Sequence, residues 1–148
     1  MVYIPSYRKL HNGYPIDIVV PPPIAGDDWV YTVPVGTRFT PIYIQASFAA
    51  DANVATREIQ TVFELAFTYR FRHQLYVGIV ANQIININLG AGLAGYMNTA
   101  RNDRLTQGLC YPVNIPGGNL IQSITGNIQA GDQWTNIYIH GIQYEDQD

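Results

Sequence analysis

From residue 29 onward, apolar and polar side chains alternate along the chain in runs. In the longest run, residues 57–69, one face is largely apolar and the other carries Glu58 and Glu64. A period of two over this length predicts a half-buried strand with both glutamates in solvent. Shorter runs of the same period lie at 38–48, 74–80, 83–89, 120–124 and 134–144. Turn-forming residues separate the runs, so the pattern predicts an all-β fold, a sandwich or a barrel.

Residues 1–27 follow a different pattern. They contain Pro5, Pro15 and the proline run 21–23, and consecutive prolines favour an extended path without internal hydrogen bonds. Apolar and aromatic side chains are spread along the segment, so we expect it to lie on a surface, either that of its own domain or that of a neighbouring subunit. The prediction is an extended, Pro-rich N-terminal arm over 1–27, followed by a single β-sandwich domain over 28–148.

The composition narrows the class of partner. The chain has 148 residues, enough for one domain, and only 13% of them are charged. Lys9 is the single lysine beside seven arginines, and no basic cluster occurs, so we expect no nucleic-acid partner. No run approaches the roughly 20 apolar residues of a membrane-spanning helix, so no membrane partner is expected. The single cysteine, Cys110, excludes an internal disulfide and a cysteine-rich metal site.

Residues suited to catalysis or metal binding are sparse. The histidines have no short ligand spacing, so no metal site is predicted from His11, His73 and His140. Glu58 and Glu64 lie six residues apart, about 20 Å at the rise of a strand, which is too far for a pair of glycosidase carboxylates. No nucleophile motif occurs and no Walker-type phosphate loop. The residues therefore predict a protein that is not an enzyme and needs no cofactor.

Tyrosine and arginine dominate the side chains suited to recognition. The chain has eleven tyrosines, and Arg70 and Arg72 flank Phe71 directly after the long alternating run. Tyrosine and arginine are enriched at the centres of protein interfaces, where lysine is depleted. A sugar-binding face fits the same composition, because aromatic rings stack on sugar rings. Composition therefore leaves two interpretations open, a subunit packed in an assembly and a carbohydrate-binding module.

A set of turn motifs carries a resemblance to a known family. Residues 29–38 read WVYTVPVGTR, a strand that ends in a T-V-P-x-G turn. Residues 46–57 read ASFAADANVATR, which looks like a loop of small residues with an arginine opening the next strand. Residues 115–124 contain IPGG and IQSI, and residues 129–134 read QAGDQW before the last long strand. In this order, over about residues 29–144, the motifs resemble those of small jelly-roll structural proteins of tailed bacteriophages.

The resemblance implies a jelly-roll-like antiparallel β-sandwich located in the virion, on the outer surface of the capsid. Proteins of this group are often capsid decoration (cement) proteins and are commonly trimeric. The implied partners are the major capsid protein and further copies of the chain, as a homotrimer. None of the shared motifs is catalytic.

Two sets of candidate site residues follow from these interpretations. For an interface with the capsid or with neighbouring subunits, the candidates are Tyr3, Ile4, Tyr7, Tyr14, Ile16, Ile18, Arg70 and Arg72. The alternative function is a carbohydrate- or receptor-binding β-sandwich of a phage head fibre or tail. For glycan binding, the candidates are Trp29, Tyr31, Trp134 and Tyr138.

Overall fold

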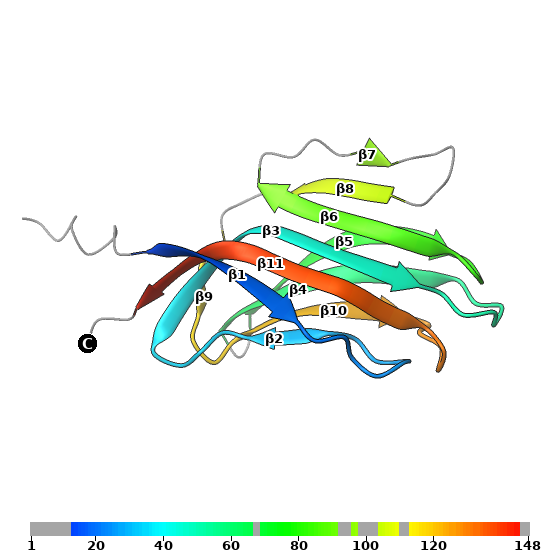
Figure 1. Cartoon of the computed structure of the whole chain (residues 1–148), viewed down its shortest axis with the longest axis horizontal. Helices are drawn as coiled ribbons and strands as arrows, with labels where there is room; N and C mark the ends of the chain where they lie inside the picture. Colours follow the sequence, from blue (N-terminus) through cyan, green and yellow to red (C-terminus); the bar gives the residue numbers. More distant parts are fainter. Residues whose placement is uncertain (1–12, 67–68, 92–95, 98–103, 110–112, 146–148) are drawn as a thin grey trace, which may run out of the picture.

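The computed structural model describes residues 13–66, 69–91, 96–97, 104–109 and 113–145. Within these ranges the chain forms eleven strands and no helix (Figure 1). The strands are β1 (Tyr14–Val20), β2 (Val30–Thr32), β3 (Thr37–Ala49), β4 (Arg57–Ala66), β5 (Tyr69–Ile79), β6 (Ile84–Ala91), β7 (Tyr96–Met97), β8 (Arg104–Leu109), β9 (Ile115–Pro116), β10 (Leu120–Gly126) and β11 (Gln133–Glu145).

The strands form two sheets, which confirms the predicted all-β sandwich. The larger sheet has the order β1-β11-β3-β6-β8-β7, with β9 paired to β3, and the smaller sheet has the order β2-β10-β4-β5. Eight of these strands, β1 to β6 with β10 and β11, have the order of a jelly roll. Along the chain they pass from one sheet to the other at every step except from β4 to β5, which are neighbours in the smaller sheet. One feature departs from the expected antiparallel sandwich: β8 pairs with β6 in parallel, so the larger sheet is mixed.

Strand β1 covers part of the predicted N-terminal arm. It pairs along its whole length with β11 of the same chain, from Tyr14 opposite Gln143 to Val20 opposite Ile137. Val20 is buried in the core, and the partly buried Ile16 and Ile18 pack against this core. Of the two surfaces considered for the arm, residues 14–20 therefore lie on their own domain, as an edge strand. Residues 1–12 lie outside the described ranges.

The core fills the space between the two sheets. Trp134 of β11 lies opposite Phe48 of β3 in register, and their rings are 4.9 Å apart between centroids. Both side chains are buried, as are the alternate apolar residues of β4 and β6. The period of two read from the sequence thus places one face of each long strand in this core.

The other face of β4 differs from the prediction. Glu58 is exposed as expected, but Glu64 is only 8% exposed and Val62 is fully buried. The reason is that β4 lies between β10 and β5, so that its outward residues have neighbours on both sides; Val62, for example, lies between Gln122 and Arg72 in register. The predicted solvent exposure of Glu64 is therefore wrong.

Two turns that are distant in sequence pack together at one end of the sandwich. The amide of Val33 donates to the carbonyl of Asn119, and the amide of Gly118 donates to the carbonyl of Val33. A Cβ at Gly117 would lie 2.5 Å from the carbonyl oxygen of Pro34, so only glycine permits this approach. The T-V-P-x-G and P-G-G motifs thus form one structural contact.

Truncating the core ring Phe48 tests the packing between the sheets. Because Phe48 is fully buried against Trp134, we expect Phe48→Ala to lower the free energy of unfolding by about 3–5 kcal/mol in chemical denaturation. Val54→Ala is the control, since Val54 is exposed, and it should change stability by less than about 0.5 kcal/mol. A loss for Phe48→Ala as small as that of the control contradicts the described core.

Candidate functional site

The outward face of the larger sheet presents a continuous row of side chains across five strands, side by side in Figure 1. Register places Val19 of β1, Tyr138 of β11, Gln45 of β3, Asn88 of β6 and Thr106 of β8 next to one another. On β11, β3 and β6 the residues flanking each of them are buried, so these three side chains point away from the core. We call this surface the outer face.

A second row lies beside the first on the outer face. It runs from Asp17 of β1 through His140 of β11 to Tyr43 of β3. The His140 Nδ1 atom and an Asp17 carboxylate oxygen are 2.6 Å apart. The Tyr43 hydroxyl donates to Oδ1 of Asn88, which links the two rows. The acidic and the basic side chain of these rows thus contact each other, and the remaining side chains are uncharged.

A different cluster fills one end of the sandwich, where the β3–β4 and β10–β11 loops meet. Arg57, the first residue of β4, is fully buried, and so is Asp132, which directly precedes β11. The Arg57 guanidinium makes two hydrogen bonds to the Asp132 carboxylate, at 3.0 and 2.9 Å. It also donates to Oδ1 of Asp51 at 2.7 Å and to the carbonyls of Asn53 and Ala55. All five guanidinium N–H groups are therefore used.

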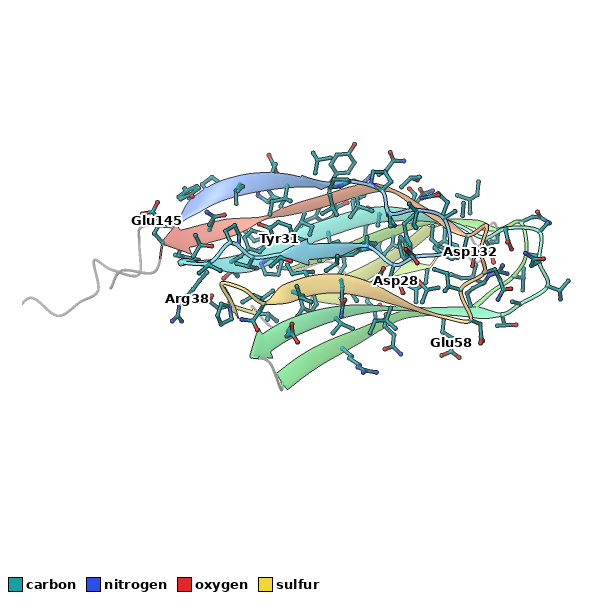
Figure 2. All side chains as sticks on the ribbon, turned by 90° about the horizontal axis from the view of Figure 1, so that it is seen from below. Asp28, Tyr31, Arg38, Glu58, Asp132 and Glu145 are labelled. Carbon is teal, nitrogen blue, oxygen red and sulfur yellow. The ribbon has the colours of Figure 1, made fainter. Side chains whose placement is uncertain are left out.

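The two carboxylates of this cluster also accept backbone hydrogen bonds. Asp132 accepts from the amides of Asp51 and Gln129, each at 2.8 Å. Asp51 accepts from the amide and side chain of Asn53 and from the amide of Gly131. The cluster therefore holds both loops as well as one ion pair. Figure 2 shows Asp132 at the end of the sandwich opposite to Arg38 and Glu145.

The environment shifts the ionisation of two of these groups. Hydrogen bonding to Asp132 raises the pKa of Arg57, whose charge is thus permanent. Desolvation raises the pKa of Asp51, but the hydrogen bonds from Asn53 and Gly131 and the charge of Arg57 outweigh it and lower the pKa below its usual value. Arg57 and Asp51 are consequently ionised at neutral pH. The cluster is structural, because the guanidinium has no N–H group left for a ligand.

The structure removes both tryptophans from the candidate glycan-binding residues. Trp29 and Trp134 are buried, with relative exposures of 2% and 1%, and belong to the core. The Trp134 indole donates to the hydroxyl of Thr125, which itself donates to Asp28. A ring that packs between the two sheets is covered on both faces, so it has no face for a sugar. The choice of Trp29 and Trp134 as candidate glycan-binding residues is therefore wrong.

The two tyrosines of the same candidate set lie apart from each other. Tyr31 of β2 is half-buried, and its ring packs edge-on against Phe39 at 6.0 Å between centroids. Burial raises the pKa of the Tyr31 phenol. Tyr138 is 44% exposed on the outer face. The structure therefore leaves Tyr138 as the exposed aromatic of that set.

The candidate interface residues are divided between the two sheets. Tyr14 is exposed on β1, whereas Ile16 and Ile18 face the core. Arg72 is exposed on β5, and Arg70 lies on the same strand opposite Glu64 in register. Strands β1 and β5 lie at opposite sides of the sandwich in Figure 1, so these residues do not form one patch. The remaining candidates lie outside the described residues: Tyr3, Ile4 and Tyr7.

Within the described ranges, no group of three His, Cys, Asp or Glu side chains is arranged to hold a metal ion. The described residues include no helix long and apolar enough to cross a membrane. Comparisons with protein-family models, with curated proteins and with solved structures found no match.

Sequence reasoning missed the pairing of Arg57 with Asp132. Each residue was part of a turn motif, the arginine that opens a strand and the Ala-Gly-Asp turn before the last strand. The two residues are 75 positions apart, and periodicity carries no information about which distant turns meet. The available signal was that Asp51 and Arg57 in one motif, and Asp132 in the other, stand beside small, turn-forming residues.

Removing the buried arginine tests the role of the cluster. We expect Arg57→Leu to lower the free energy of unfolding by about 3–5 kcal/mol, because Asp132 would remain buried and uncompensated. The double variant Arg57→Leu/Asp132→Leu should lose less than the sum of the two single variants, measured by denaturation as a double-mutant cycle. The exposed Arg72 gives the matched control, Arg72→Leu, with little change. Additive losses in the cycle would contradict the ion pair.

The lowered pKa of Asp51 predicts a pH dependence. A carboxyl whose folded pKa is below its unfolded value stabilises the fold above the unfolded pKa, and this stability is lost as pH falls through the folded pKa. Stability should therefore decline as pH falls from about 5 to about 3, and Asp51→Asn should decline less over that range. Asp27→Asn, at an exposed carboxylate, is the control and should keep the wild-type slope. Equal slopes for all three proteins would contradict the assignment.

Proposed function

We propose that the chain is a non-enzymatic virion structural protein, a decoration (cement) protein that binds the outer surface of a phage capsid and stabilises the head. The jelly-roll fold and the resemblance of the turn motifs to phage structural proteins support this proposal. The proposed partners are the major capsid protein and two further copies of the chain.

The observation that carries the proposal is a concentration of exposed apolar side chains along one side of the sandwich. Of the nine large hydrophobic side chains exposed among the described residues, five lie between residues 14 and 35. Four of them, with exposed fractions from 43% to 77%, define what we call the β1/β2 edge: Tyr14, Val19, Ile24 and Val30. Strands β1 and β2 run along this same side of the molecule (Figure 1).

The backbone of this edge is also suited to contact with another protein. In the described part of the chain, β1 pairs only with β11 and β2 only with β10, so each strand presents one unpaired side. Such an edge accepts an added strand from a partner, and apolar side chains beside it add buried area. Residues 1–12 precede β1 directly and contain the predicted contact residues Tyr3, Ile4 and Tyr7.

Binding of this kind stabilises a capsid by adding contacts across the boundaries between its subunits. A standard protein interface buries about 1,200–2,000 Å² in total, and a trimer that engages several capsid subunits multiplies weak contacts by avidity. Light scattering of the purified protein should therefore give three times the chain mass of 16.5 kDa.

Substitution of Ile24 tests the proposed contact with the capsid. Ile24 is 77% exposed in the loop after β1, so Ile24→Asp should leave the fold intact and lower binding to undecorated phage heads at least tenfold, measured by co-sedimentation. The interface with the capsid would bury the new carboxylate without a partner. The free-energy cost of this burial is several times that of a tenfold loss of binding affinity. Val54→Asp is the matched control, with the same charge added to an exposed loop residue elsewhere. Equal binding by both variants, or no binding by the wild type, contradicts the proposal.

A further inference from the structure

We propose that the outer face of the larger sheet is a binding site for an extended, uncharged polysaccharide. This site goes beyond the proposed contact with the capsid, because it uses the face of the sheet. Of the four side chains of the β1/β2 edge, it shares Val19 alone, at the end of the first row. The inference depends on three properties of the outer face: its charge, its hydrogen-bonding groups and its exposed aromatic ring.

The charge of the outer face fits a neutral ligand. Across the two rows described above, the acidic and basic side chains are Asp17 and His140, which contact each other at 2.6 Å. Arg104 of β8 lies beyond them, opposite Asn86 in register. A ligand with a phosphate or carboxylate on every unit would find no array of cations here to bind it. The binding of an uncharged sugar polymer does not require such an array.

The hydrogen-bonding groups of the outer face match those of sugar hydroxyls. Amides and hydroxyls both donate and accept, as sugar hydroxyls do, and the first row contains Gln45, Asn88 and Thr106. Gln45 is exposed to solvent. The Tyr43 hydroxyl donates to Oδ1 of Asn88. This hydrogen bond holds the carbonyl end of the amide toward Tyr43, so its N–H₂ group points away from Tyr43. Polar groups that are oriented in advance lose less entropy on binding.

The exposed ring of Tyr138 completes the site. Tyr138 lies between Val19 and Gln45 in the first row and is 44% exposed, so its ring offers an apolar surface next to amide groups. An aromatic ring with a polar end suits a ligand whose C–H faces and hydroxyl edges alternate. The row crosses five strands and therefore spans about 19 Å, enough for several sugar units of an extended chain. An open sheet face binds each chain weakly, and several copies of the protein raise the affinity by avidity.

Affinity electrophoresis tests this site in the full-length protein. With a net charge of −3, the protein migrates toward the anode in native gels that contain one soluble polysaccharide each. The probes are dextran, soluble starch, hydroxyethyl cellulose and galactomannan, with anionic hyaluronan for comparison. We expect at least one neutral polymer to retard the wild type and hyaluronan not to do so. Tyr138→Ala and Gln45→Ala should each raise the dissociation constant at least tenfold without changing mobility in polymer-free gels.

Tyr14→Ala is the matched control, because Tyr14 is a tyrosine of nearly equal exposure, 43%, at the end of β1. It should be retarded like the wild type. Absence of retardation by all four neutral polymers overturns the proposal, as does equal loss of retardation for Tyr14→Ala and Tyr138→Ala. A Tyr138→Ala variant of lower oligomeric mass than the wild type also overturns it, since the face would then be an interface between copies. Binding to heads is measured separately with Ile24→Asp, so failure of either proposal leaves the other testable.

Discussion

The buried ion pair between Arg57 and Asp132 is the interaction on which the rest of the sandwich depends. Asp51 follows β3 and Asp132 precedes β11 in the larger sheet, whereas Arg57 opens β4 in the smaller sheet. One guanidinium therefore joins the two sheets at one end. Burial of a charge is costly unless its partners are complete. Here every N–H group of the guanidinium is used, and backbone amides of both loops donate to the carboxylates.

This arrangement also fixes the two long strands on which the proposed polysaccharide site lies. The ends of β3 and β11 at the ion pair are held by hydrogen bonds, and from there the strands run side by side, interrupted by a register shift between Thr135 and Tyr138. Tyr138 and Gln45 lie opposite each other directly after that irregularity. The residues that flank each of them in the chain are buried in the core. The positions of the two outer side chains are therefore set by the packing of these neighbours. A site on a rigid sheet is more closely positioned than one on loops.

Much of the local structure is readable from the sequence, and most of the long-range structure is not. Predicted runs at 38–48 and 134–144 correspond to β3 and β11 within one residue at each end, because their alternation reflects one buried face. Glu64 was placed in solvent because periodicity describes one strand, whereas its burial comes from the neighbours of β4. The pairing of Arg57 with Asp132 and the contact of Gly117 with Pro34 join turns far apart in the chain. Such contacts depend on sheet topology, which no local pattern encodes.

The low charge of the chain has different consequences for its two candidate surfaces. With 13% of residues charged, polarity is supplied largely by amides and hydroxyls, which stay hydrated on the outer face. The β1/β2 edge is instead aliphatic and aromatic, and it gains free energy when covered. A protein that covers its apolar edge against a larger assembly and leaves a neutral polar face in water satisfies both surfaces at once. The opposite orientation, with the amide face buried and the apolar edge exposed, is less favourable for both surfaces. Buried amides need new hydrogen-bond partners, and apolar side chains that stay in contact with water gain no free energy from burial.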